Sequence, residues 1–275
     1  MGAKTKIDWC DATWNPVTGC LHGCEYCYAR RIAERFRARE IYDPECQCQR
    51  HLIERGMLKG TRKPLELDYP WEQKNKDGSI TNAAYPFGFD PTFHRYKLDE
   101  LQHWKKPRTI FVCSMADLFG EWVPDEWIAE VFKACEKAPQ HRYLFLTKNP
   151  ARLCKMASAG VLPRHNNWWF GSTLDSKNAK RFQGGFVYNT FVSVEPLTEH
   201  MHVGLGSFGS DEWVIIGAET GNRKGKIIPK REWVENIVEA AQITGMKVFM
   251  KESLRGLMGE DFRQEFPWEV SADDA

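Results

Sequence analysis

Short apolar runs rich in β-branched and aromatic residues recur through the second half of the chain, and they limit the possible folds more than any other feature. The runs cover residues 108–114, 142–147, 167–173, 190–195, 212–217 and 246–251. Each has the length and near-continuous apolar character of a strand buried on both faces. Segments with apolar residues on one helical face lie between several of them, at residues 123–139 and 229–245. This alternation predicts a parallel α/β fold, an open or partial (βα) TIM-like barrel.

The N-terminal part of the chain begins the same alternation and then departs from it. Residues 12–20 predict a first strand, and residues 29–40 predict the helix that follows. Residues 42–107 show little strand periodicity. A structureless stretch of that length is unusual inside a domain, so it indicates a functional or partly helical insertion. We expect a single domain over residues 1–275 with an inserted irregular segment at about 42–107.

Composition leaves the class of partner open. The 275 residues carry a net charge of +1, which neither requires nor excludes a polyanion, because a basic face can lie within a neutral total. No apolar run approaches the roughly 20 residues that span a bilayer, and the N-terminus lacks the apolar core of a secretion signal. We expect a cytoplasmic protein without a membrane partner. In a reducing compartment, nine cysteines favour metal or redox chemistry over disulfides.

Three of these cysteines follow the first predicted strand, with the spacing Cys20-x3-Cys24-x2-Cys27. Structural zinc prefers four protein ligands, whereas an iron–sulfur cube held by three cysteines keeps one iron open for another molecule. The triplet therefore favours an iron–sulfur cluster, with a zinc site as the alternative. Candidates for a fourth zinc ligand are His22, Cys10 and His51.

The remaining cysteines are predicted to be structural. Cys46 and Cys48 are separated by one residue, a poor fit to the usual spacing of zinc ligands, so we interpret them as ordinary thiols. Cys113, Cys135 and Cys154 fall on apolar faces of predicted strands or helices, and we expect them in the core.

Polar residues follow several of the predicted strands. They include Ser114, Asp117, Ser172, Thr173, Glu195 and Glu219. Because loops after the carboxyl ends of parallel strands carry the chemistry of such folds, we expect these residues around one mouth. A carboxylate there can bind ribose hydroxyls, orient an amine or accept a proton, so Glu195 and Glu219 are candidate catalytic residues. Glu195 is the first choice because Pro196 fixes the turn around it.

The triplet, with aromatic Tyr26 directly before the third cysteine, resembles the radical S-adenosylmethionine (SAM) signature. The chain is further similar to the phage Gp37/Gp68-type (DUF5131) family in an ordered set of motifs: WNPVTGCLHGCEYCYA, VCSMADLF, FLTKNP, GSTLDS, SVEPL and WVIIGAETG. This resemblance implies that Cys20, Cys24 and Cys27 hold a [4Fe–4S] cluster whose fourth iron is chelated by SAM. It also implies reductive cleavage of SAM to a 5′-deoxyadenosyl radical that abstracts hydrogen from a substrate, with an external electron donor.

The resemblance gives further residues a place near the cofactors. Tyr26 would lie beside the cluster. Ser114 and Asp117 follow the second strand of the predicted barrel, where radical SAM proteins handle the SAM amino group, although SMAD replaces the usual Gly-Gly-Glu form. The cofactor-binding candidates are completed by Ser172, Thr173 and Glu195. Ser172 and Thr173 would bind the SAM ribose or carboxylate, or instead cap the segment that follows them.

Several substrates remain open. The run ARRIAERFRARE after the cysteines is either a solvated helix with Arg–Glu pairs or a phosphate-contacting face. The aromatic residues either form the core or stack a base. The first hypothesis is a radical SAM enzyme, an isomerase or other base-modifying enzyme, that acts on a nucleic-acid base or a hypermodified thymidine in phage DNA, in the host cytoplasm. The alternatives are a radical SAM enzyme for a small molecule or peptide, and a zinc-stabilised nucleic-acid-binding protein without redox activity.

Overall fold

The computed structural model describes residues 5–38, 41–42, 64–201 and 208–269. The chain divides into two compact units. One comprises residues 13–107 and 112–140, and the other comprises residues 3–12, 108–111 and 141–275. In the described ranges, no helix combines the length and the apolar character needed to cross a membrane.

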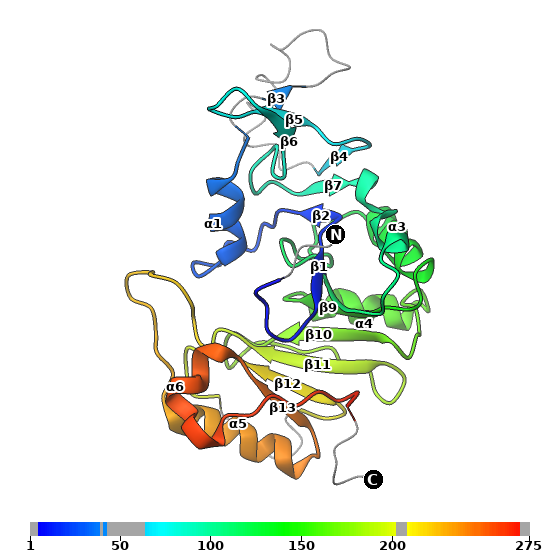
Figure 1. The fold of residues 1–275 in the computed structure, drawn as a ribbon. Helices are drawn as coiled ribbons and strands as arrows, with labels where there is room; N and C mark the ends of the chain where they lie inside the picture. Colours follow the sequence, from blue (N-terminus) through cyan, green and yellow to red (C-terminus); the bar gives the residue numbers. More distant parts are fainter. Residues whose placement is uncertain (1–4, 39–40, 43–63, 202–207, 270–275) are drawn as a thin grey trace. The chain divides into compact units, whose positions relative to one another are not determined.

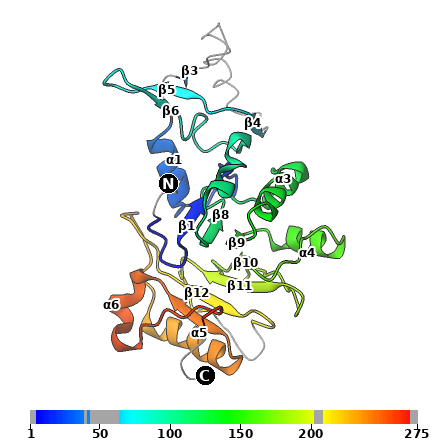
Figure 2. The same cartoon turned by 45° about the vertical axis from the view of Figure 1, so that its right-hand side comes forward.

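The predicted strands form one seven-stranded sheet (Figures 1 and 2). Its order is β1 (Ala12–Trp14), β8 (Thr109–Val112), β9 (Arg142–Thr147), β10 (Trp168–Thr173), β11 (Asn189–Val194), β12 (Trp213–Ile216) and β13 (Lys247–Met250). Each pairing from β9 to β13 is parallel. All six runs predicted as buried strands are confirmed, and every residue of β8, β10 and β12 is buried.

Alternate residues of these strands build two separate apolar layers in the second unit. Val214 and Ile216 of β12 pack with helix α5 (Arg231–Ile243), which buries Val234, Ile237, Val238, Ala240 and Ala241. Trp213 and Ile215 point to the other face, where they pack with Trp9 and with aromatic side chains of β11 and β13. The strands read as continuous apolar runs because both of their faces are covered.

The predicted helix at residues 123–139 is also confirmed, as α3 (Asp125–Glu136), and Pro124 caps its first turn. A further helix, α4 (Pro150–Ser158), follows β9. Cys113 and Cys135 are buried as expected. Cys154 is exposed on α4, so the expectation that it lies in the core is wrong. The neighbouring residue Leu153 takes the buried position of that helical turn.

The first strand and the first helix are both shorter than expected. Residues 12–20 form two strands in different sheets, β1 and β2 (Val17–Thr18), because Pro16 lacks the N–H group that a continuing ladder needs. Helix α1 (Tyr28–Arg35) ends before Phe36, whose N–H still donates to the carbonyl of Ile32, so the prediction of a helix to residue 40 is wrong.

The described part of the predicted insertion carries short strands and helical turns. They are β3 (Ile41–Tyr42), β4 (Leu65–Leu67), β5 (Glu72–Lys74), β6 (Ile80–Asn82), β7 (Thr92–His94), η1 (Arg95–Lys97) and η2 (Glu100–His103). Outside the insertion, η3 (Glu252–Leu254), α6 (Arg255–Met258) and η4 (Gly259–Asp261) follow β13. Strands of two or three residues are too short to show an alternation in the sequence. The assignment of one domain with an insertion remains a prediction.

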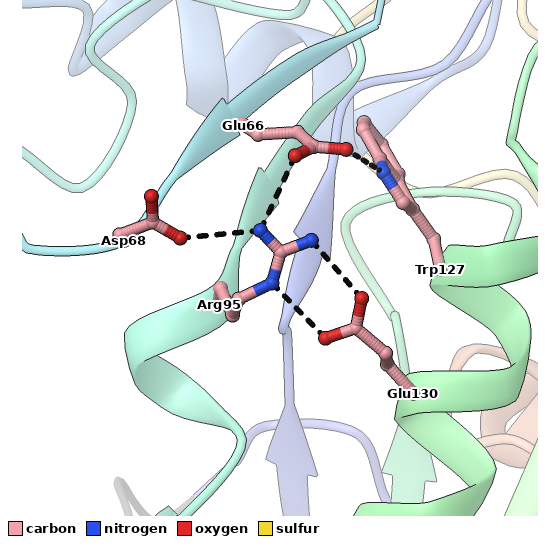
Figure 3. A network of polar contacts seen from close by, with 5 residues as sticks. All are labelled: Glu66, Asp68, Arg95, Trp127 and Glu130. Atoms are coloured by element: carbon pink, nitrogen blue, oxygen red, sulfur yellow. Dashed lines mark hydrogen bonds and ion pairs between the residues drawn. The ribbon is translucent and has the colours of Figure 1, made fainter.

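Arg95 joins this region to α3 (Figure 3). Its Nε and Nη2 atoms donate to the two carboxylate oxygens of Glu130, both at 3.0 Å. Its Nη1 atom donates to Glu66 at 3.2 Å and to Asp68 at 3.1 Å, and Trp127 Nε1 also donates to Glu66. The hydrogen bonds to Glu130 are the main reason that the pKa of Arg95 is raised above its usual value. One guanidinium therefore links β4 and η1 to the helix.

Replacing Arg95 by Met should lower the free energy of unfolding by about 1–3 kcal/mol, because three carboxylates lose their shared counter-ion and Glu130 loses a bidentate partner. The matched control is Asp68→Asn, which removes one contact from a carboxylate that is 73% exposed and should cost less than about 1 kcal/mol. Urea denaturation measures both variants. Equal losses would show that the bidentate pair with Glu130 does not carry the link.

Candidate functional site

The backbone of the cysteine loop is held closely against its own unit. Gly19 has φ of +85°, and a Cβ there would lie 2.2 Å from the carbonyl oxygen of Asp90, so only glycine fits. The N–H of Gly19 donates to Met115 O at 2.9 Å, and the N–H of Cys20 donates to Phe89 O at 3.3 Å. The first cysteine is thus placed by two neighbouring segments.

The loop ends at the start of helix α1. Cys27 is the N-cap, and its Sγ atom accepts a hydrogen bond from the Arg30 N–H at 3.3 Å. The side chain of Arg30 turns back, donating to the carbonyl of Cys20 at 3.2 Å, and its guanidinium lies 4.9 Å from the ring centre of Phe89. The Cys27 sulfur therefore lies at a helix N-terminus and accepts one backbone hydrogen bond.

The three cysteine side chains are half-buried and close enough to affect one another electrostatically. The pKa of the Cys20 thiol is raised to about 12, mainly by burial and in smaller part by the charges of Asp117, Cys24 and Cys27. A raised pKa favours the protonated thiol, whereas coordination to a metal cation favours the thiolate. A cluster of positively charged irons would therefore offset the cost of three neighbouring thiolates. The donor set fits an iron–sulfur cluster.

The candidate zinc ligands that the structure describes are not gathered around one point. Among the described residues, the three cysteines included, no three or more His, Cys, Asp or Glu side chains are arranged to hold a single metal ion. Cys10 belongs to the other unit, where it packs against the apolar layer around Trp9. His51, Cys46 and Cys48 lie outside the described residues.

His22 and Asp117 form a pair that the sequence did not indicate. His22 Nε2 and Asp117 Oδ2 are 2.7 Å apart, and the imidazole lies edge-on to Trp122 at 4.9 Å between ring centres. The Asp117 side chain is only 7% exposed, and its Oδ1 atom accepts from the N–H of Phe119 at 3.0 Å. The predicted contact of Asp117 with SAM remains a prediction, and the contacts observed for its carboxylate are to His22 and Phe119.

Ser114 connects the segment after β8 to Asn15, which follows β1, and to Tyr28 at the start of α1. Its hydroxyl donates to Asn15 Oδ1 at 3.1 Å, and the same oxygen accepts from the N–H of Met115 at 3.0 Å. Its carbonyl accepts from the hydroxyl of Tyr28 at 2.8 Å. Tyr26 lies half-buried in the cysteine loop. The cysteines, Tyr26, Ser114 and Asp117 therefore belong to one unit, and only the adjacency of β1 and β8 in a predicted sheet could have indicated these contacts.

The second unit carries charged pairs where its parallel strands end. Lys148, after β9, pairs with Asp175, after β10, at 2.7 Å. Glu195, after β11, forms an ion pair with Lys251, after β13. Gly217 directly follows β12, and a Cβ there would come within 2.8 Å of Lys251 Cδ and 3.3 Å of Glu195 Cδ, so a larger residue would push this pair apart.

The other predicted residues of this unit are buried. Glu219 accepts two hydrogen bonds from Arg223, at 2.6 and 2.7 Å, and its side chain is 2% exposed. The Ser172 hydroxyl accepts from the N–H of Phe182 at 2.8 Å, and Thr173 is buried at the end of β10. The roles of Ser172, Thr173, Glu195 and Glu219, and their meeting with the cysteines at one mouth, remain predictions.

Solved structures of one enzyme share this fold. The structure of spore photoproduct lyase complexed with dinucleoside spore photoproduct has a TM-score of 0.51 at 10% identity, over 91% of this chain and 79% of that one. A cysteine-to-alanine mutant of the lyase with the same ligand has a TM-score of 0.53 at 11% identity, over 91% and 79%. These likenesses confirm the expected fold, a partial TIM-like barrel of the radical SAM type.

Sequence comparison identifies the family. No curated protein matches the chain. The family model described as "Protein of unknown function (DUF5131)" matches residues 4–257 and thus most of the sequence. The chain belongs to this family, as its motifs predicted.

Proposed function

We propose that the chain is a radical SAM enzyme that modifies a base in nucleic acid. The observation that carries the proposal is the cysteine loop, in which three half-buried thiols precede the first helix of a partial barrel. The fold is shared with spore photoproduct lyase, a radical SAM enzyme whose solved complexes contain a dinucleoside lesion. A hypermodified thymidine in phage DNA is the specific substrate we propose, and the cytoplasm, that of the host for a phage-encoded chain, is the proposed location.

Cys20, Cys24 and Cys27 would hold three irons of a [4Fe–4S] cluster, and the amino and carboxylate groups of SAM would occupy the fourth. When bound, these cofactors supply one-electron cleavage of SAM and a 5′-deoxyadenosyl radical that abstracts hydrogen. The protein contributes placement and shielding. Arg30 donates its backbone N–H to Cys27 Sγ, while Phe89 and Met115 pack apolar surface against Cys20 and Cys27.

The charged pairs of the second unit are candidates for holding a substrate. Lys251 can neutralise the carboxylate of Glu195, or release it to accept a proton or a hydroxyl hydrogen bond from a bound ligand. Glu219 has a different character, since Arg223 engages both of its oxygens and the pair braces the loop that follows β12. We therefore favour Glu195 over Glu219 as the substrate-contacting carboxylate.

Support for a nucleic-acid substrate comes from the part of that loop after Glu219, residues 220–230 (Figure 1). This part contains no acidic residue, and Lys224, Lys226 and Lys230 are exposed. Ile228 is 76% exposed beside them. Exposed lysines can contact phosphates, and an isoleucine can press against an unstacked base. Hydrogen bonds within the loop, from Lys226 to the Gly221 carbonyl for example, hold it in shape.

The decisive experiment is anaerobic reconstitution with iron and sulfide, followed by addition of dithionite and SAM. We expect about four irons per chain and formation of 5′-deoxyadenosine that increases with DNA. Cys27→Ala should lose both iron and product, because each thiolate holds its own iron. Cys154→Ala, at an exposed cysteine on α4, is the matched control and should keep both. Stoichiometric zinc with no product would favour the structural zinc site instead.

Charge reversal in the basic loop should weaken binding to DNA. We expect Lys224→Glu combined with Lys226→Glu to lower DNA affinity about tenfold or more and to reduce its dependence on salt, because two phosphate contacts are lost. Fluorescence anisotropy with a labelled duplex measures this effect. Lys155→Glu, on exposed α4, serves as the control. Unchanged affinity in the double variant would remove this support for a nucleic-acid substrate.

A further inference from the structure

Helix α1 presents a row of large apolar side chains to solvent. Tyr28, Ile32 and Phe36 are 43%, 38% and 56% exposed, and their spacing of four residues places them along one face. The neighbouring face carries Ala29 and Ala33, which are buried against Phe89 and Met115. Single exposed apolar residues are ordinary, but an uninterrupted row of three marks a surface that another molecule covers.

The rim of this row is basic. Arg31 and Arg35 are exposed on the same side of the helix, and the Arg35 guanidinium lies 5.3 Å from the ring centre of Phe36. The other arginines of the helix region are engaged elsewhere: Arg30 bonds to the Cys20 carbonyl, and Arg37 pairs with Glu34 at 3.5 Å. An apolar centre with arginines around it has the composition of a protein–protein interface, and its charge fits an acidic partner.

The row begins directly beside the cysteines. Tyr28 follows Cys27 in the chain, and its hydroxyl is fixed to the Ser114 carbonyl. From Tyr28 to Phe36 the helix rises only about 12 Å, at 1.5 Å per residue. A protein seated on this surface would therefore hold its own redox centre close to anything bound by Cys20, Cys24 and Cys27.

We infer that this surface, formed by Tyr28, Arg31, Ile32, Arg35 and Phe36, is the docking site of a small acidic electron-transfer protein, a flavoprotein or a ferredoxin-type protein. The inference rests on the proposed function, which requires one electron from outside. In the step, the donor's centre is oxidised by one electron and the cluster is reduced by one electron, with no covalent bond made or broken. The small size of the surface suits a transient encounter, the class to which electron-transfer complexes belong.

Nucleic acid is the competing occupant, since arginine binds phosphate as well as carboxylate. One observation favours the protein: the lysine-rich loop at residues 220–230 already offers another surface for phosphates. The experiment must therefore measure both ligands.

The test uses Arg31→Glu combined with Arg35→Glu, and separately Ile32→Ser, with Lys133→Glu and Lys137→Glu on α3 as a control of equal charge change. Calorimetry measures the affinity of a purified, oxidised, strongly acidic flavodoxin for each chain at low salt, and circular dichroism checks the fold. We expect the affinity to fall about tenfold or more in the arginine variant, less in the isoleucine variant, and not in the control. An unchanged affinity in the arginine variant, or no binding to the unmodified chain, would overturn the inference.

Two further measurements separate the possible failures. If the arginine variant loses binding to a DNA duplex and keeps its affinity for flavodoxin, the surface belongs to nucleic acid and the inference is wrong. In reconstituted protein, the same variant should cleave SAM normally with dithionite and poorly with reduced flavodoxin. If even the unmodified chain fails with dithionite, the proposed function has failed, whereas the calorimetry still decides whether the surface binds the acidic protein.

Discussion

The site depends on a close approach between two backbone segments. Gly19 lies so near the Asp90 carbonyl that no side chain fits, and the N–H groups of Gly19 and Cys20 donate to the carbonyls of Met115 and Phe89. This contact places the first cysteine before any cofactor binds. Since metal ligands must be held within a few tenths of an ångström of their working positions, a rigid backbone at the first ligand lowers the entropy lost when a cluster forms.

Side chains then fix the loop from its other end. The His22–Asp117 pair and the bond from Tyr28 to the Ser114 carbonyl both join the cysteine loop to the segment after β8. Asp117 is nearly buried, so its interaction with His22 is less screened by water than a surface pair would be. The loop is thus held by the segment after β8 and by the backbone of Phe89 and Asp90, and Ala29 and Ala33 of α1 pack on Phe89 and Met115 from the same two segments.

The sequence predicts the elements whose residues are buried in a regular pattern. It does not reveal features that depend on a single residue or on one contact between distant residues. Strands β9 to β13 are visible because both faces are covered, which makes their residues continuously apolar. The break at Pro16 is a local effect that apolar periodicity does not reveal, and the strands of the insertion are too short for any periodicity. The cysteine triplet is local and was therefore recognisable, whereas His22 and Asp117 are 95 residues apart and become neighbours only through the adjacency of β1 and β8. The same limit hid the pairing of Glu195 with Lys251, which requires the strand order.

The nearly neutral total charge conceals two basic surfaces of different chemistry. Acidic groups gather elsewhere, as around Arg95, where one guanidinium faces three carboxylates. Helix α1 combines arginine with apolar and aromatic side chains, a combination suited to a flat protein surface bearing carboxylates. The loop at residues 220–230 combines exposed lysines with isoleucine, which suits phosphates flanking an unstacked base. Because the two surfaces differ in composition and belong to different units, the proposed electron donor and the proposed nucleic-acid substrate would contact different side chains.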